Sequence, residues 1–198
     1  ISLNNMNKTT HINFTYKQIR NYQIDLIQTY ESMYDNFKNE TKKIIETSSK
    51  TISIQKKIDP EDYINFLKNS NTRKIKLNDF EELKLCSLIR TLCKYNLGEV
   101  WGAFDSKKKL CGAAFFLMYL NRLSLLTIHK SSKTSNMSSD YLIINEFIKE
   151  NASKSITLDL FQNAKDKELI LNSGFGCIET ISIELISNKH SFFYNIIK

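Results

Sequence analysis

Hydroxyl and basic side chains follow a short apolar run near the middle of the chain. The run at 123–128 ends at His129, and a polar loop then leads to an amphipathic segment at 140–150. A strand that passes through a loop into a helix N-terminus can hold an anion, because unpaired backbone N–H groups converge there. The pattern predicts an anion site in this loop. The alternative is an ordinary solvated loop, with the helix capped by Ser138 or Ser139.

The basic residues are spread along the chain. The 198 residues carry a net charge of +7, which would suit nucleic acid, an anionic cofactor or an anionic surface. The alternative is a lysine-rich solvated surface, because the lysines form no single block. Lys42 and Lys43, with Arg73, Lys74 and Lys76, could form a basic face for RNA or a nucleotide-linked substrate, or else a solvated helix face.

Cysteine usage indicates the compartment. Cys86, Cys93, Cys111 and Cys177 form no C-x-x-C pair, and no histidine lies at metal-ligand spacing from them. This pattern is typical of core thiols in a reducing compartment, so we expect a cytoplasmic protein without a metal. The sequence has no run of about 18 apolar residues, so no apolar membrane-spanning helix is expected.

Hydrophobic periodicity predicts the helices and strands. One long helix is expected over 29–48, a second begins at Asp59 and Pro60, and a third is capped by Asn78 or Asp79 and runs to about residue 96, where Gly98 ends it. The further expected helices are 140–150 and 165–172. The expected strands are 21–26, 51–58, 99–104, 110–120, 123–128, 155–160 and 177–186.

These elements predict an α+β domain in which helices flank a mixed, mainly antiparallel twisted sheet. We expect the domain to cover residues 21–198, after an extended lead-in or linker remnant over residues 1–20. The first residue is Ile1, so a fragment of a longer protein is expected.

The order of the elements, and six stretches within them, resemble a known family. The stretches are 21–26, 34–44, 110–117, 144–148, 156–160 and 174–176. Their order is similar to that of GNAT-type acyltransferases and, more closely, to the C-terminal GNAT-like domain of the FemABX-related, peptidoglycan-bridge aminoacyltransferase-like family. The resemblance implies a GNAT-like fold with a splayed pair of parallel strands at 123–128 and 156–160. Since that family often carries two such domains in tandem, it also implies a missing domain upstream.

The resemblance also implies a donor site. In GNAT enzymes an acyl-CoA lies in the wedge between the splayed strands, and its pyrophosphate sits on the N-terminal amides of the next helix. The implied donor is therefore an acyl-CoA, and acetyl-CoA is the first candidate. The implied contacts are Leu126, Thr127, Ile128, Lys130, Lys133, Ser135, Asn136, Met137, Ser138 and Ser139. The loop departs from the family pattern, because it lacks the glycine that would let the backbone close on phosphates.

Transfer to an amine needs a group that takes up a proton. His129, at the end of the first splayed strand, and Asp159, on the second, are the candidates; a histidine at a strand end can also be a plain surface residue. Many GNAT enzymes place a tyrosine after the second strand to protonate the leaving thiolate. Residues 161–164 contain none, and they also lack the acidic, Gly-containing segment of FemABX relatives.

Three functions follow from this reasoning. The first is an N-acyltransferase that moves an acyl group from acyl-CoA to an amine of a small molecule or peptide by direct attack. The second is a FemABX-like aminoacyl transferase with aminoacyl-tRNA as donor. The third is a catalytically silent GNAT-like domain that binds or scaffolds a partner.

Overall fold

The computed structural model describes residues 2–4, 14–69, 78–131, 138–160 and 174–187. Its strands are β1 (Ser2–Asn4), β2 (Phe14–Asp25), β3 (Ile52–Lys56), β4 (Gly98–Asp105), β5 (Leu110–Tyr119), β6 (Arg122–Lys130), β7 (Thr157–Leu160) and β8 (Ile178–Ser187). Its helices are α1 (Tyr30–Asp35), α2 (Asn39–Ser49), α3 (Pro60–Asn69), α4 (Asp79–Lys94) and α5 (Ser139–Asn151).

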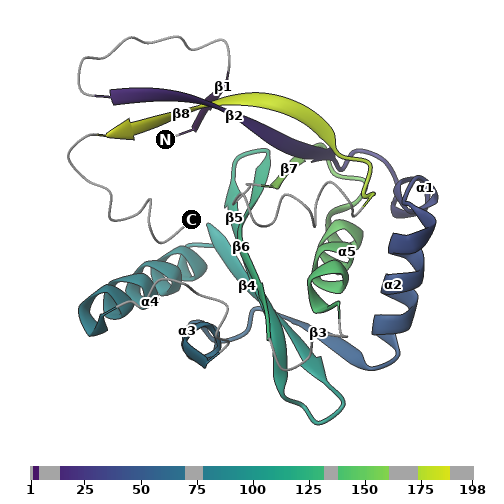
Figure 1. The fold of residues 1–198 in the computed structure, drawn as a ribbon, viewed down its shortest axis with the longest axis horizontal. Coiled ribbons are helices and arrows are strands. Elements are labelled where there is room, and N and C mark those ends of the chain that lie inside the picture. Colours follow the sequence, from purple (N-terminus) through teal and green to yellow (C-terminus); the bar gives the residue numbers. More distant parts are fainter. Residues whose placement is uncertain (1, 5–13, 70–77, 132–137, 161–173, 188–198) are drawn as a thin grey trace.

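The strands join into one eight-stranded sheet in the order β1-β8-β2-β7-β6-β5-β4-β3 (Figure 1). Every neighbouring pair runs antiparallel except β6 and β7, which are parallel. The predicted α+β class, with a mainly antiparallel sheet and one parallel pair, is confirmed. Within the described ranges, every helix is too short or too polar to cross a membrane.

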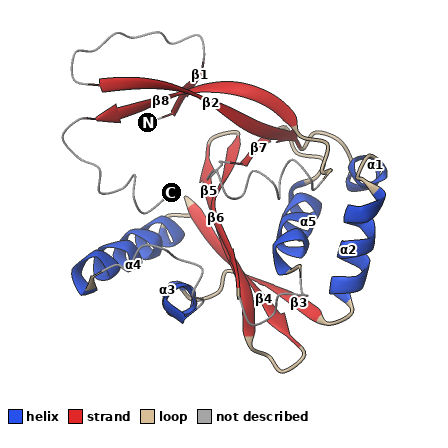
Figure 2. Ribbon diagram, viewed as in Figure 1, coloured by secondary structure: helices blue, strands red, loops and turns tan. Residues whose placement is uncertain are grey.

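Helices cover the two faces of the sheet unequally. Figure 2 shows α1, α2 and α5 on one side of strands β3 to β6, and α3 and α4 on the other. We call these sides the α5 face and the α3 face. Each carries its own apolar core: Ile128, Phe147 and Leu160 belong to the first, and Tyr63, Ala113 and Phe115 to the second. A side chain on a central strand can therefore be assigned to a face by its packing partners.

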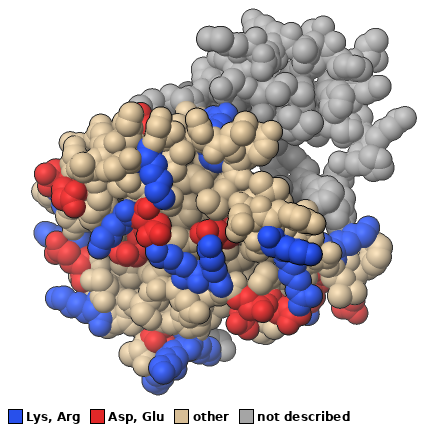
Figure 3. All heavy atoms as spheres, turned by 180° about the vertical axis from the view of Figure 1, so that it is seen from behind, with Lys and Arg blue, Asp and Glu red and all other residues tan. Residues whose placement is uncertain are grey.

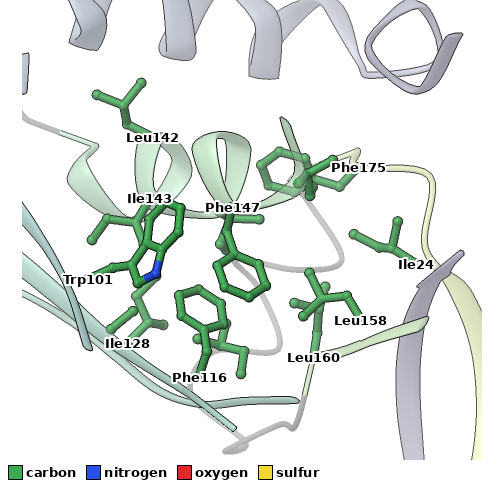
Figure 4. Packing of buried hydrophobic residues seen from close by; sticks show 14 of the residues in the cluster. Ile24, Trp101, Phe116, Ile128, Leu142, Ile143, Phe147, Leu158, Leu160 and Phe175 are labelled. Atoms are coloured by element: carbon green, nitrogen blue, oxygen red, sulfur yellow. The ribbon is translucent and has the colours of Figure 1, made fainter. Parts of the chain in front are cut away.

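Aromatic rings fix α5 against the sheet. The rings of Phe116 and Phe147 stack with centroids 3.6 Å apart, and Trp101 packs edge-on against Phe147 at 5.1 Å (Figure 4). Such pairs stabilise a fold beyond their area burial, because their geometry is specific. The position of α5 relative to β4, β5 and β6 is thus set by large, fully buried side chains.

The single helix predicted over 29–48 is wrong, because α1 ends at Asp35 and α2 begins at Asn39. The side-chain amide of Asn36 donates to the Ser32 carbonyl, and the Lys38 amide donates to the Gly174 carbonyl across the chain. The Lys38 bond takes the place of the i→i−4 hydrogen bond that its amide would make in a continuous helix. Apolar periodicity continues through the break, since Phe37 is buried, so the sequence pattern alone did not reveal it.

Other elements match with shifted ends. β2 begins at Phe14, within the segment expected as a lead-in, because it pairs with β8 along ten residues, 14–23. The predicted cap of α4 is confirmed, since Asn78 and Glu81 form a reciprocal capping box. The helix ends at Lys94, and Gly98 begins β4 rather than ending the helix. The expected helix 165–172 lies outside the described residues.

Candidate functional site

The described part of β7 pairs in parallel with β6 over four positions. The ladder runs from Arg122 opposite Thr157 to Leu125 opposite Leu160, and β6 then continues to Lys130. Its other edge stays paired with β5 as far as Gly112 opposite Lys130. Among the described strands, none pairs with the β7-side edge of β6 over residues 126–130. We call this stretch the free edge, and it offers backbone N–H and C=O groups to a ligand.

A β-bulge lies where the free edge begins. Phe116 pairs with Leu125, but Phe115 pairs with Thr127, so Leu126 is the extra residue on β6. Leu126 packs with the α3-face core, and the Thr127 hydroxyl hydrogen-bonds the Tyr63 hydroxyl of α3. Two consecutive side chains thus face α3. A bulge bends its strand and increases the local twist, and this one lies directly after the last described pair of β6 and β7.

The first turn of α5 is pressed against β5. Ser139 is fully buried, and its hydroxyl donates to the Cys111 carbonyl at 3.5 Å. A Cβ atom at Gly112 would lie only 2.3 Å from the Ser139 Oγ atom. Glycine at position 112 is therefore what allows the N-terminus of α5 to sit beside the free edge.

That helix N-terminus already carries a carboxylate. Asp140 is buried, and its Oδ1 accepts the backbone N–H of Tyr141 at 3.0 Å. Its Oδ2 lies 3.5 Å from the Nζ of Lys130, the last residue of β6. A negative side chain in the first turn stabilises the helix dipole. The Asp140 carboxylate thus partly offsets the positive field at the helix N-terminus that a ligand phosphate would use. The Lys130 ammonium lies beside this carboxylate.

The two predicted proton acceptors lie on the same face but apart. His129 pairs with Ala113, a member of the α3-face core, and its Nε2 atom is buried. Asp159 lies between Leu158 and Leu160, which pack on the α5 face, so its side chain points to the α3 face. It pairs with Ser124, five residues before His129 on β6. At about 3.3 Å per residue the two lie roughly 15 Å apart along the sheet, so the structure does not bring them together.

Asp159 is held by two polar neighbours. The Nη2 atom of Arg122 lies 3.2 Å from its Oδ2 and donates to its Oδ1 at 3.4 Å. Burial raises the pKa of Asp159, while the charge of Arg122 and a hydrogen bond from the Gln23 side chain lower it. The net shift is upward, because the carboxylate is almost fully removed from water.

The remaining predicted donor contacts divide into two groups. Leu126, Thr127 and Ile128 form the free edge, and Ser138 is the N-cap of α5, without a side-chain cap hydrogen bond. The others, Lys133, Ser135, Asn136 and Met137, lie outside the described residues. Sequence reasoning missed Gly112, Arg122, Asp140 and Tyr63. Tyr63 looked like one more apolar residue in a helix stripe, and only the register of β6 brings its hydroxyl to Thr127.

The pKa of all four cysteine thiols is raised, with burial as the largest cause. Burial raises the pKa of the Cys111 thiol to about 11 and that of Cys177 to about 12, so both remain protonated at neutral pH. In the part of the chain that the structure describes, no three His, Cys, Asp or Glu side chains come together as a metal site.

Charges on the surface are mixed. Figure 3 shows lysines and arginines interspersed with acids over the face turned away from the view in Figure 1. Lys42, expected on a basic face, lies over the Tyr34 ring and donates to the Asp35 carbonyl. Arg73, Lys74 and Lys76 lie outside the described residues. The described face thus favours the solvated-surface alternative.

Comparison with known proteins identifies the fold. No protein-family model and no curated protein sequence matches the chain. The solved structure of FemX matches with a TM-score of 0.62 and 7% identity, covering 89% of this chain and 64% of FemX. The chain has a GNAT-like fold related to that of FemX. L-PGS from Bacillus licheniformis matches at 0.53 with 12% identity, over 93% of this chain and 66% of L-PGS.

A shorter protein, described as histone acetyltransferase HPA2 and related acetyltransferase from Corynebacterium glutamicum, matches with a TM-score of 0.49 and 14% identity, over 67% of this chain and 95% of that one. The chain therefore spans less than two thirds of FemX and nearly the whole length of this smaller protein. The parallel pairing of β6 and β7 falls at the strands where the resemblance noted in the sequence implied a parallel pair.

Proposed function

We propose that this protein is an N-acyltransferase in which an amine attacks an activated acyl donor held in the wedge between β6 and β7. The observation that carries the proposal is the free edge of β6, which begins at a bulge directly after the described ladder with β7 and is followed by the N-terminus of α5. An extended donor arm can bind such an edge through backbone hydrogen bonds, as an added strand does. The FemX-like fold supports the proposal.

Charge at the α5 N-terminus favours aminoacyl-tRNA as the donor. A pyrophosphate bound there would meet the buried Asp140 carboxylate, which Lys130 offsets only in part. A like charge about 5 Å away at an effective dielectric constant of about 20 costs about 3 kcal/mol. An aminoacyl ester is neutral at its reacting carbonyl and needs no diphosphate at this helix. The resemblance to the FemABX-related proteins implies the same donor.

The reaction then requires one bond exchange and one proton transfer. The amine nitrogen attacks the ester carbonyl, the C–N bond forms, and the bond from the carbonyl carbon to the ribose oxygen breaks. A base takes the proton from the attacking nitrogen and passes it to the ribose oxygen, which leaves as a hydroxyl. We assign that role to His129, because it lies on the free edge, whereas Asp159 is paired with Arg122 and lies opposite Ser124, before the edge begins.

Acyl-CoA is the second candidate donor. Ser138 makes no side-chain cap hydrogen bond in α5, so its hydroxyl can bind a donor phosphate. The backbone N–H of Ser139 and the ammonium of Lys130 would bind the same phosphate. Transfer from acetyl-CoA would break the thioester C–S bond and release the thiol. Lys133, Ser135, Asn136 and Met137 remain proposed contacts for this donor.

The test measures transfer from both donors to one acceptor. The protein is incubated with the tripeptide Gly-Ala-Gly and either a mixture of tRNAs charged with radiolabelled amino acids or radiolabelled acetyl-CoA. We expect labelled peptide from charged tRNA, slowed on the order of a hundredfold by His129→Gln. Label from acetyl-CoA alone would support the second donor. Label from neither would contradict the proposal and favour a silent binding domain.

A further inference from the structure

Arg122 and Asp159 form an ion pair that joins the two parallel strands. Arg122 is the first residue of β6, and Asp159 lies in β7. The Asp159 side chain is 4% exposed, whereas that of Arg122 is 46% exposed. The acid is therefore part of the interior, and the guanidinium is held at the surface above it. This asymmetry differs from a solvated ion pair, in which both partners are mobile.

The guanidinium keeps donors for a ligand. Both of its contacts with Asp159 run through Nη2, and neither Nε nor Nη1 forms a hydrogen bond or ion pair with a described residue. Arginine presents five N–H groups in a planar fork that matches a carboxylate or phosphate. Tyr119 pairs with Arg122 across the β5–β6 hairpin and is 69% exposed. An exposed aromatic ring thus lies beside a pre-oriented anion receptor.

The pair lies on the α3 face of the two parallel strands. α5 packs on the opposite face of β6, and among the described elements the main strand contacts of α3 are with β4 and β5 and that of α4 is with β4 (Figure 1). Arg122 stands three residues before Leu125, where the described ladder with β7 ends. At about 3.3 Å per residue the Arg122 backbone lies roughly 10 Å from this point, and the guanidinium, which reaches Asp159 opposite Ser124, lies within that distance. Two to three residues of extended peptide span that length.

We propose that Arg122 binds an anionic group of the acceptor, and that the acceptor is a short peptide-like amine with a carboxylate within roughly 10 Å of its attacking nitrogen. Asp159 is then a positioning residue that fixes the guanidinium, rather than the proton acceptor. The inference rests on the proposed function, since it places the attacking amine at the wedge. It also predicts a preference for acceptors with a carboxylate, which the transfer reaction alone does not require.

The experiment compares Gly-Ala-Gly, which has a free carboxylate, with its C-terminal amide as acceptors. The ratio of kcat/KM for the two peptides is measured with the charged-tRNA mixture as donor. We expect the wild type to prefer the carboxylate peptide at least tenfold, chiefly through KM, since a charged hydrogen bond is lost with the amide. Arg122→Gln should remove the preference, and Arg122→Lys should keep part of it.

Arg90→Gln is the matched control. Arg90 is also a half-exposed arginine paired with an acid, Glu61, but it lies on α4. It should leave the preference unchanged. A wild type that uses both peptides equally would overturn the inference, and so would an Arg122→Gln variant that folds and keeps the preference.

Direct binding separates this inference from the proposed function. Saturation-transfer NMR on the protein and each peptide, without a donor, measures the same preference in the absence of turnover. Preferential binding of the carboxylate peptide, lost in Arg122→Gln, supports the anion receptor even if no label is transferred. Equal binding overturns it even if transfer is observed. If Arg122→Gln does not fold, the comparison of the two peptides on the wild type and Arg122→Lys decides the question.

Discussion

Gly112→Ala should displace the N-terminus of α5 from the sheet. The added Cβ atom would lie 2.3 Å from the Ser139 Oγ and 2.7 Å from the Ser139 Cβ. Both distances are far below van der Waals contact. Ser139 cannot swing away, because it is fully buried and belongs to a helix held by the stacked Phe116–Phe147 rings. The strain must therefore be taken up by a shift of the helix.

The expected cost follows from these contacts. Overpacking a core by one methyl group costs about 1–3 kcal/mol, and the short distances favour the upper end. Replacing glycine by alanine within a strand returns about 0.5–1 kcal/mol, so the net loss should be about 2 kcal/mol. For a domain of this size that corresponds to a fall in Tm of about 4–8 °C.

A double-mutant cycle provides the control. Ser139→Gly removes both atoms that the new Cβ would meet, so Gly112→Ala should cost almost nothing in that background. The free energies of unfolding of the four proteins are measured by urea titration. A neutral Gly112→Ala, or two substitutions whose costs simply add, would refute the proposed contact between β5 and α5.

Three further predictions concern the site. Asp140→Asn should lower the free energy of unfolding by about 1 kcal/mol and should raise the affinity for CoA in calorimetry, because the competing charge at the helix N-terminus is gone; unchanged CoA affinity would argue against the charge explanation for donor choice. Tyr63→Phe should speed amide hydrogen exchange over residues 126–130 without a matching global change, since the Thr127 hydroxyl loses its partner; equal acceleration throughout the protein would mean a purely structural role. Because the pKa of Asp159 is raised in the folded protein, its contribution to stability, relative to Asp159→Asn, is fully present below the unfolded pKa of about 3.9 and is lost as the pH rises through the folded pKa. Urea titrations from pH 3 to pH 7 should therefore show that the free energies of unfolding of the wild type and Asp159→Asn draw closer as the pH rises. A difference that grows with pH would contradict the direction of the pKa shift.

Local patterns predicted most of the architecture. Alternation and turn residues located the meander β4–β5–β6, and the strand–loop–helix pattern located α5. Gly174 and Gly176 both adopt positive φ, as the expected turn requires. The break between α1 and α2 was missed, because it depends on a bond from Lys38 to Gly174, which lies far away in the sequence.

The candidate site was less predictable, for a physical reason. The free edge was expected from the family resemblance, but its bulge depends on how β5 and β6 align. From the sequence alone, Asp140 is an ordinary acid in the first turn of a helix. Its burial beside Lys130 depends on the tertiary structure. Arg122 was one of many scattered basic residues, and only the register of β6 against β7 joins it to Asp159. Contacts between strands decide these roles, and periodicity along one strand does not contain them.

Hydrogen exchange tests directly whether the free edge of β6 holds the acyl donor. Puromycin, an amide-linked analogue of the aminoacyl end of charged tRNA, is added to the protein, and exchange is followed in peptides covering residues 122–131 and in the rest of the described chain. We expect slower exchange over residues 126–130, with little change in β5, whose amides are already paired. Unchanged exchange over residues 126–130, in a protein that nevertheless transfers aminoacyl groups, would contradict it.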